Sequence, residues 1–413
     1  MKGLTLTIVT PKIQSVNYGE TIGNVSTLKK LSTGTENPKK LITYFSDKAI
    51  KFDVKRIGRD QFNWNLMNKS VVSVFVNNYR DGNFDHDNFL KDMIAKYEEF
   101  DLFGGMFADI GNVSDEIKQK INNEDEIRRL AESLGDKDEI NIGEDKLKIK
   151  QLKDYFENKV KGGSKKKISK LIQESIGKEI SYCKFLTIDD TNKLKRSQPV
   201  RFSNGYSISE FVYDMNLLND IDAYNRYIQY TAGQKKQSLV YPEEHLSYYT
   251  YTLTIDLDKI GASEKEDNGR VVFEPVVDPD VRTKRVNDIL KIVLLYLNRK
   301  IKGRDERLTP VFLIGGVYDV KHPFFANAIY FSEQNQKLHF NADDIKKIFD
   351  TYKSPDISTD TFLYFHDSFV DVEDKDQLLS QSEKSQLKKQ NLHEILQAMA
   401  QKVSGYYEGK EQQ

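Results

Sequence analysis

Two patterned segments in the second half of this 413-residue chain constrain its fold most strongly. Tyr248–Leu257 is rich in β-forming residues and alternates along most of its length, which predicts a strand. Asp278 and Pro279 are typical of a helix N-terminus, and the apolar residues after them recur at helical spacing as far as Leu297. Val311–Val317 predicts a further strand. The order strand, helix, strand favours an α+β fold.

The first half of the chain repeats this order less clearly. Leu4–Val9 alternates threonine with aliphatic residues and predicts a central strand, whereas Pro11–Lys40 contains scattered Gly, Pro and Lys and predicts a loop-rich excursion. Ser46 is a candidate N-cap for a helix that extends through Arg56. Two β, α, β runs predict a ferredoxin-like or RNA-recognition-motif (RRM) sheet with large insertions.

Shorter signals predict elements that flank or extend this core. They are a strand at Val71–Val76, a helix at Asn88–Phe100, an edge segment at Ala328–Phe331, a helix at Asp343–Tyr352, a strand at Phe362–Phe365 and a terminal amphipathic helix at Glu383–Val403.

Length and composition exclude several classes of protein. The chain is longer than the size at which one core usually stops growing, and we favour one core with insertions over two domains. The formal net charge of -1 argues against a basic domain that coats nucleic acid, but it leaves room for a local basic groove. The single cysteine, Cys183, excludes an internal disulfide and favours a reducing, cytoplasmic location. No segment approaches the roughly 18 apolar residues that span a bilayer.

A long stretch near the middle is strongly charged and poor in hydrophobic residues. Val113–Asp145 contains 11 acidic and 5 basic residues, and Lys146–Arg196 contains 15 basic and 6 acidic residues. The favoured interpretation is a solvated helical insertion whose two blocks pair with each other. The alternative is that its basic part, around Gly162–Lys167, contacts phosphates.

This stretch ends abruptly at Arg196–Ser209. The new segment alternates apolar, basic and hydroxyl residues around Gly205. The pattern predicts a projecting hairpin that grips a polyanion.

The sequence contains no recognisable catalytic motif. Its six histidines are scattered without a metal-binding spacing, and the His-Asp neighbours at Phe84–Asp87 and His366–Asp367 are weak signals. There is no GxxxxGK[ST] or GxGxxG loop, and the aromatic RNP1 pattern of an ordinary RRM is absent. Gly104–Gly105 and Gly315–Gly316 are interpreted as tight turns or close backbone contacts. We therefore expect no enzyme activity, no metal and no cofactor.

Four segments in the same order resemble the DevR branch of the CRISPR-associated backbone proteins. They are Gln14–Glu20, Tyr44–Phe52, Asp101–Phe107, and Val200–Ser203 followed by Ser207-Ile208. This branch, DevR/Cst/Csh, belongs to the Cas-seven family of the RAMP superfamily and supplies the repeated guide-RNA-binding subunit of type I-B Cascade. Two departures stand out: the first helix carries Lys48 and Lys51 where arginine is commoner, and the insertion is unusually charged.

The resemblance implies an α+β fold with a modified RRM-like palm, a helical finger insertion and a β-hairpin thumb. The implied divisions are 1–112 for the first half of the palm with an N-terminal loop insertion, 113–195 for the finger, 196–245 for the thumb, whose hairpin is expected at about Pro199–Asn225, and 246–413 for the second half of the palm with a C-terminal helix. The implied partners are CRISPR RNA (crRNA), target DNA through the guide, further copies in a head-to-tail filament and other Cascade subunits, with no membrane.

The resemblance also assigns RNA-binding roles, each with a structural alternative. Arg201, with Lys195 or Arg196, is expected to contact phosphate at the base of the thumb, unless these residues form a solvated turn. Lys48, Lys51 and Arg56 are expected to face the guide backbone, and Ser15 and Asn17 to bond phosphate or ribose. Ser203 is a candidate because it belongs to the same motif as Arg201. Phe202, Tyr206 and Phe211 are expected to wedge between bases or to cover a neighbouring subunit. Their alternatives are a solvated surface for Lys48, Lys51 and Arg56, loop capping for Ser15 and Asn17, and simple packing for Phe211.

Two rival functions remain open from the sequence. A backbone subunit of the type III kind cleaves RNA with a loop aspartate, for which Asp47 or Asp101 is the candidate, although Asp47 is explained better as an acid in the first turn of a helix. A charged scaffold or regulator without RNA is the second rival.

Overall fold

The computed structural model of the protein describes residues 2–34, 40–67, 86–107, 139–142, 145–148, 194–220, 227, 230, 238–267, 269–352, 357, 360–373 and 391–411. The chain forms two compact units. The first comprises Met1–Leu66, Ile94–Phe103 and Gln198–Gln413, and the second comprises Met67–Met93 and Gly104–Ser197.

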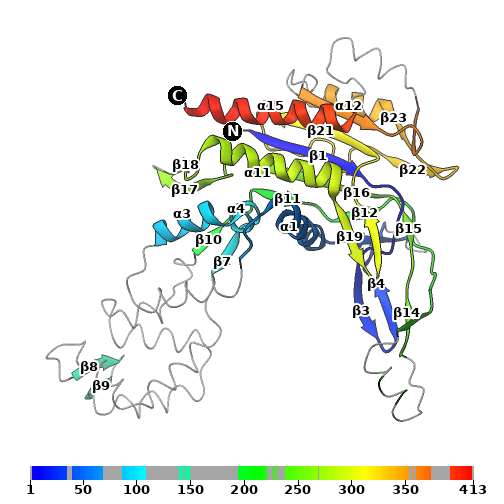
Figure 1. Ribbon diagram of the computed structural model, residues 1–413, viewed down its shortest axis with the longest axis horizontal. Coiled ribbons are helices and arrows are strands. Elements are labelled where there is room, and N and C mark those ends of the chain that lie inside the picture. Colours follow the sequence, from blue (N-terminus) through cyan, green and yellow to red (C-terminus); the bar gives the residue numbers. More distant parts are fainter. Residues whose placement is uncertain are drawn as a thin grey trace. The chain divides into compact units, whose positions relative to one another are not determined.

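The first unit is built on an antiparallel sheet of eight described strands (Figure 1). Their order is β24 (Thr361–Phe365), β21 (Phe312–Tyr318), β1 (Gly3–Val9), β16 (Tyr249–Asp256), β12 (Gly205–Ser207), β6 (Lys40–Phe45) and β5 (Lys30–Thr33), with β11 (Val200–Phe202) also paired to β16. The strands predicted at Leu4–Val9, Tyr248–Leu257, Val311–Val317 and Phe362–Phe365 are confirmed, and β1 lies in the interior of the sheet as expected.

Three long helices belong to one face of this sheet. They are α1 (Asp47–Phe62), α11 (Pro279–Lys291), which continues as the π-helix η3 (Ile292–Tyr296), and α15 (Leu392–Glu411). Figure 1 shows α11 and α15 side by side, and their apolar residues share one core with Leu4, Leu6 and Ile8 of β1. The alternation predicted for β1 therefore selects the residues that face the helices.

A second core lies behind β21. In that strand Leu313 and Val317 join the helix-side core, whereas Phe312, Ile314 and Tyr318 join the second one. The second core is completed by residues around α12 (Ala342–Tyr352) and the small sheet of β22 (Phe331–Gln334), β23 (Lys337–Asn341) and β25 (Val370–Glu373). β21 is consequently buried on both sides, which explains its unbroken apolar sequence.

The prediction of a loop-rich excursion at Pro11–Lys40 is wrong. This segment contains four strands: β2 (Ile13–Gln14), β3 (Tyr18–Ile22), β4 (Val25–Leu28) and β5. The first three pair with one another or with distant partners, β14 (Ser238–Pro242) and β15 (Leu246–Ser247). Short strands with Gly and Lys carry little pattern of their own, and the partners of β2 and β4 in β15 and β14 lie more than half the chain away.

The prediction of a projecting hairpin at Pro199–Asn225 is also wrong in its first part. β11 and β12 do not pair with each other, since both pair with β16 in the main sheet. An antiparallel pair does form later in the range, where β13 (Leu218–Asp220) pairs with β14. β14 also joins β4 and β3 in a four-stranded sheet.

Several helix boundaries differ from those predicted. The helix expected at Asn88–Phe100 is two helices, α3 (His86–Lys96) and α4 (Glu98–Phe103), and the helix after Ser46 continues to Phe62. Ser46 is confirmed as its N-cap, because its Oγ accepts a hydrogen bond from the Ala49 amide. The terminal helix is described only from Leu392, and the segment predicted as an edge at Ala328–Phe331 ends at the first residue of β22.

The described parts of the second unit are mainly short strands and most of α3, up to Met93. β7 (Gly105–Phe107) pairs with β10 (Leu194–Arg196), and β8 (Glu139–Ile142) pairs with β9 (Asp145–Lys148). The strand predicted at Val71–Val76 and most of the charged insertion at 113–195 lie outside the described residues. Two further hairpins belong to the first unit, β17 (Ala262–Asp267) with β18 (Arg270–Pro275) and β19 (Asn298–Ile301) with β20 (Arg304–Arg307).

Gly315 and Gly316 lie where backbones approach closely. The sequence had offered this and a tight turn as the two interpretations. Gly315 has a φ of 150°, and a side chain there would collide with the carbonyl of Thr5 on β1. A side chain at Gly316 would meet the carbonyl of Asp360. Glycine therefore lets β21 fit between its two neighbours.

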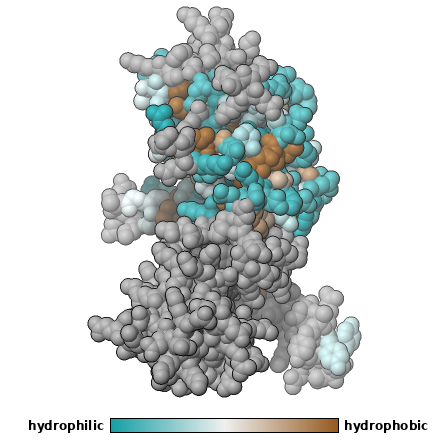
Figure 2. Space-filling view, turned by 90° about the vertical axis from the view of Figure 1, so that its left-hand side faces the viewer, coloured by the Kyte–Doolittle hydropathy of each residue, from teal (hydrophilic) through white to brown (hydrophobic). Residues whose placement is uncertain are grey.

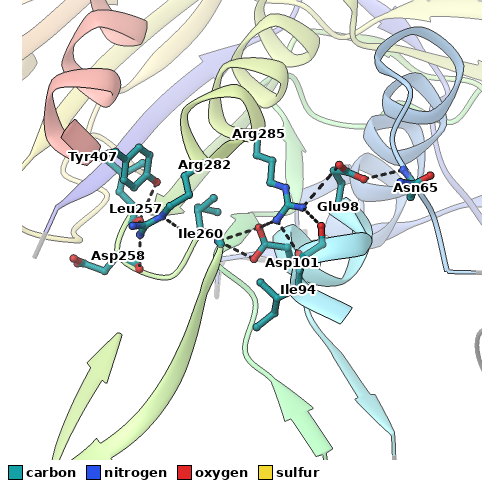
Figure 3. A network of polar contacts seen from close by, with 12 residues as sticks. Asn65, Ile94, Glu98, Asp101, Leu257, Asp258, Ile260, Arg282, Arg285 and Tyr407 are labelled. Carbon is teal, nitrogen blue, oxygen red and sulfur yellow. Dashed lines mark hydrogen bonds and ion pairs between the residues drawn. The ribbon is translucent and has the colours of Figure 1, made fainter. Parts of the chain in front are cut away.

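A buried ion pair joins α11 to α4 (Figure 3). Arg285 is 2% exposed, and its guanidinium lies 2.7 Å from the fully buried carboxylate of Asp101 while also donating to the Ile94 and Ala95 carbonyls. The Gly261 amide donates to both Asp101 oxygens at 3.0 Å. The pair thus fixes α11, α4 and the loop after β16 to one another.

A neighbouring arginine holds the same loop from inside. Arg282 donates to the carbonyls of Ile260, Asp258 and Leu257, and its guanidinium lies over the Tyr407 ring at 4.3 Å. The Tyr407 hydroxyl donates to the Leu257 carbonyl at 2.9 Å.

Within the described residues, no helix combines the length and the apolar character needed to cross a lipid bilayer.

We predict that Asp101→Asn lowers the free energy of unfolding by about 3–5 kcal/mol, because it removes the nearer carboxylate from the buried Arg285 charge and leaves only Glu98, at 3.9 Å. Chemical denaturation measures this. Glu274→Gln, which breaks the exposed pair between Lys265 and Glu274, is the control and should cost less than about 1 kcal/mol. Equal losses in the two variants would contradict the central role of the buried pair.

Candidate nucleic-acid interface

The face of the main sheet that points away from the helices carries rows of threonine. In β16, Tyr251, Leu253 and Ile255 belong to the helix-side core, so the alternate residues Thr250, Thr252 and Thr254 face the other way. β1 contributes Thr5 opposite Thr254 and Thr7 opposite Thr252. This face is therefore lined with hydroxyl groups.

The loop between β21 and β22 covers part of this face. Thr5 and Thr7 are buried, and the Thr5 hydroxyl lies 3.5 Å from the His322 carbonyl in this loop. Over β16, β11 and β12 the face stays open as a hollow of about 180 Å³. Its lining consists of Arg201, Phe202, Ser203, Asn204, Tyr206, Thr250, Tyr251, Thr252, Thr254, Pro323, Ala326 and Asn327.

Arg201 is the cationic member of the hollow's lining. It is exposed and lies opposite Thr254 in the register of β11 and β16. The next outward-facing residue of the chain, Ser203, accepts a hydrogen bond from the Thr252 amide at 2.8 Å. An exposed guanidinium among hydroxyl groups suits a phosphate with its attached sugar.

The N-terminus of α1 is connected to the hollow through Asn204. The Asn204 side-chain oxygen accepts a hydrogen bond from the Asp47 amide at 3.1 Å, in the first turn of α1. Ser46, the N-cap, also accepts from Asn17 at 3.4 Å. The positive end of this helix dipole therefore lies beside the turn between β11 and β12.

Three of the basic candidates are exposed, and one is partly paired. Arg201, Lys48 and Lys195 are exposed, the last of them in the second unit. Lys51 forms an ion pair with Asp47 at 2.9 Å and donates to Gln198 at 2.7 Å. Lys48 and Lys51 lie in the first turns of α1, as expected.

Four candidates have structural surroundings that leave them little freedom to meet RNA. Ser15 is fully buried and accepts a hydrogen bond from the His245 amide at 2.8 Å. Arg56 donates to the carbonyl and side chain of Asn298 and pairs with Asp53, so it connects α1 to β19. Phe202 and Arg196 are each 6% exposed, and Phe202 belongs to the helix-side core. The alternation of β11 buries Phe202 and exposes Arg201.

Tyr206 and Phe211 differ in their exposure and neighbours. Tyr206 is half-buried at the rim of the hollow, where its ring lies 6.2 Å from that of Tyr44. Phe211 packs edge-on against His245 at 5.6 Å and carries Lys30 over its ring at 4.7 Å. Tyr206 is therefore the aromatic candidate that borders the hollow. Phe211 instead packs against His245, in agreement with the alternative of simple packing.

The two aspartates considered for RNA cleavage have other partners. Asp101 is the buried counter-ion of Arg285. Burial opposes ionisation of Asp47, but the hydrogen bond and charge of Lys51 outweigh it and lower the pKa of Asp47. An ionised acid at the N-terminus of α1 matches the helix dipole. In the described part of the chain, no three His, Cys, Asp or Glu side chains are placed to hold a metal ion.

Sequence reasoning missed the hydroxyl and amide groups of this site. The outward position of Thr250, Thr252 and Thr254 could have been predicted, because they alternate with the core residues of the strongest predicted strand. Nothing in the sequence distinguishes Asn204 and Asn327 from ordinary turn residues. Asn327 has a φ of 56°, a conformation that asparagine tolerates better than most residues.

A second hollow, of about 540 Å³, has a different chemistry. Its lining consists of Gln14, Val212, Tyr213, Asp214, Met215, Asn216, Glu244, His245 and Leu246. Val212 is 77% exposed and Leu246 is 58% exposed. Carboxylates repel phosphate, and exposed apolar side chains suit a protein surface.

One sequence family matches most of the chain. The family described as "CRISPR-associated negative auto-regulator DevR/Csa2" matches residues 6–132 and 127–337. The protein belongs to the CRISPR-associated DevR/Csa2 family. This agrees with the DevR resemblance of the four sequence segments.

Two solved structures resemble this DevR/Csa2 protein. A chain described as "CRISPR RNA-guided surveillance complex, pre-nicking" is 10% identical, with a TM-score of 0.44, and the likeness covers 97% of this chain and 100% of that one. A chain described as "CRISPR RNA-guided surveillance complex" is 9% identical, with a TM-score of 0.39, and the likeness covers 97% and 99%. No curated protein matches the sequence.

His245, which lines the second hollow, sits in a buried cluster of hydroxyl groups. Its Nδ1 lies 2.7 Å from the Thr43 hydroxyl, which in turn lies 2.7 Å from the Tyr249 hydroxyl. Its Nε2 lies 3.5 Å from the Ser209 hydroxyl. Burial lowers the pKa of His245, although the Glu210 backbone and the charge of Glu333 oppose this shift.

This lowered pKa predicts a stability that depends on pH. The unfolded chain takes up a proton at His245 near pH 6.5, and the folded chain does so only at lower pH. The free energy of unfolding should therefore fall as the pH drops below about 6.5, by at most about 1.4 kcal/mol per pH unit. Denaturation across this range should show a flatter slope for His245→Gln than for the control, His393→Gln, which removes an exposed histidine. Identical slopes would contradict the prediction.

Proposed function

We propose that this protein is a non-catalytic, guide-RNA-binding backbone subunit of a type I-B CRISPR Cascade effector. It polymerises along crRNA and presents the guide for pairing with target DNA in antiviral defence. The observation that carries this proposal is the open hollow of the main sheet, in which exposed Arg201 stands among threonine, serine and asparagine side chains. Membership of a CRISPR-associated family supports it.

The order of the core elements supports an RRM-like palm. Along the chain β1, α1, β12, β16, α11 and β21 alternate as β, α, β, β, α, β, and the four strands lie in the spatial order β21, β1, β16, β12. This is the ferredoxin-like arrangement. In this proposal the second compact unit is the finger, and β13 with β14 is the thumb, later in the chain than the hairpin expected from the sequence.

The positions of two aspartates support a role without catalysis. Asp101 is fully buried against Arg285, so it has no access to a ribose hydroxyl. Asp47 pairs with Lys51 in the first turn of α1. A backbone subunit that cleaves RNA needs an exposed acid near the bound strand. Asp101 does not meet this condition, and the partly exposed Asp47 is held in its ion pair with Lys51.

The second hollow supports assembly with another protein subunit. Within it Glu244 pairs with Arg304 at 3.2 Å and Asp214 accepts from the Met215 amide, while apolar side chains stay exposed. On the face shown in Figure 2, hydrophobic residues form separate patches among hydrophilic ones. A subunit that stacks along RNA needs a protein contact separate from its RNA contact, and we assign that contact to the second hollow.

We predict that Arg201→Glu weakens binding of crRNA by about 10- to 100-fold, the range expected for one charge-assisted contact. The slope of log affinity against log salt should shrink by about 0.7, the value for one phosphate of a single strand. Titration of repeat–spacer RNA into the purified chain measures both quantities. Arg270→Glu, at an exposed arginine of β18, is the matched control. An equal loss in both variants would mean that the effect comes from net charge alone, and it would contradict the assignment of Arg201 as a phosphate contact.

We predict that Leu246→Arg prevents co-purification with other Cascade subunits and leaves RNA binding by the isolated chain unchanged, because it charges an apolar wall of the second hollow. Val272→Arg places the same charge on an exposed valine of β18 and is the control. Intact assembly in the Leu246 variant would show that this hollow is not the protein contact.

A further inference from the structure

The hollow on the open face differs from a base-stacking sheet in the kind of residue that it presents. A sheet that stacks bases needs flat aromatic side chains on its open strands. Here the corresponding positions of β16 are Thr250, Thr252 and Thr254, and Tyr206 stands at the rim. The threonine positions of the hollow can therefore donate and accept hydrogen bonds, and the aromatic side chain on this open face, Tyr206 of β12, lies opposite Thr250.

The polar groups of the hollow are available. Among the described residues, no hydrogen bond to another protein group is formed by the hydroxyls of Thr250, Thr252 or Thr254, or by the side chain of Asn327. Threonine hydroxyls can donate and accept, and the asparagine amide offers both an oxygen and an NH₂ group. A ligand with a hydroxyl group of its own can satisfy them.

The size and charge of the hollow limit what it can hold. Its volume of about 180 Å³ is below the roughly 300–1,000 Å³ of pockets that enclose a whole small ligand. It therefore suits one unit of a polymer. Arg201 sits at one wall, beside Thr254, and Asn327 sits in the covering loop. A phosphate on Arg201 would bring its attached sugar over the threonine floor.

We propose that this hollow is a ribose-selecting subsite, in which Thr254 and Asn327 bind the 2′-hydroxyl of the nucleotide whose phosphate is held by Arg201. The inference rests on the proposed function and deepens it, because it names how the subunit distinguishes RNA from DNA. The 2′-hydroxyl both donates and accepts hydrogen bonds, and it is the group by which a protein can tell the two polymers apart.

The test compares RNA and DNA oligonucleotides of one single-stranded sequence, titrated into the purified full chain. The wild-type protein should prefer RNA. Thr254→Val, which replaces the hydroxyl with a methyl group of similar size, and Asn327→Gly, which keeps the positive φ, should each lower this preference about five-fold, the effect of one lost hydrogen bond. Affinity for DNA should stay unchanged in both variants.

Matched controls isolate the hollow from general effects on the fold. Thr33→Val makes the same change in the edge strand β5, and Asn335→Gly makes the same change at another asparagine of positive φ, 50°. Both should keep the wild-type preference for RNA. Thermal unfolding of all four variants verifies that each is folded.

The outcomes separate this inference from the proposed function. If the wild type binds RNA but the Thr254 and Asn327 variants keep its preference, or lose RNA and DNA affinity equally, the ribose subsite is overturned while RNA binding stands. If the wild type binds RNA and DNA equally, the subsite is also overturned. If the wild type binds neither polymer, the proposed function itself fails.

Discussion

The pairing of Arg285 with Asp101 inside the protein is the interaction on which the rest of the structure depends. A charge buried to this extent is tolerated only where a counter-ion and further hydrogen bonds satisfy it. Arg285 is on α11, Asp101 is on α4, and the Gly261 amide that completes the site comes from the loop after β16. These contacts fix where the central strand ends and where its following helix begins. The end of β16, which contributes to the open face of the sheet, is held in place by these contacts.

The chemistry of the candidate interface follows from strand alternation. Residues of β1 and β16 that face the helices are aliphatic or aromatic, and most of those that face away are threonines. Because the two strands are in antiparallel register, their threonines meet in rows. The covering loop buries the threonines of β1, whereas Thr250 and Thr254 of β16 stay partly exposed in the hollow that contains Arg201. One surface thus combines a cation with neutral hydroxyl groups, which suits recognition of a sugar-phosphate chain more than of bases.

The sequence was informative where pattern and local chemistry agree. The strand at Tyr248–Leu257, the helix that begins after Asp278 and the N-cap at Ser46 were all predictable, because each depends on neighbouring residues. Arg201 was predictable as an exposed basic residue, but the neighbouring Phe202 was not recognised as a core residue, since the hairpin prediction placed both on a projecting element.

Long-range pairing explains what could not be predicted. β2 and β4 are recognisable as strands only together with β15 and β14, which lie more than half the chain away. The same holds for Asn327, which reaches the hollow through a loop between β21 and β22. Arg56 is a surface-like basic residue in the sequence, but its bond to Asn298 depends on a hairpin in the second half of the chain.

The pairing of β1 also has a consequence for how the chain is synthesised. Gly3 at its start is opposite Asp256 on one side and Tyr318 on the other. While the ribosome makes the intervening residues, this apolar strand has neither neighbour, and both of its edges are open. Such strands are prone to pair with other chains, and folds dominated by distant contacts form slowly. The sheet closes around β1 only after β21 has left the ribosome, so the strand needs protection from other chains until then.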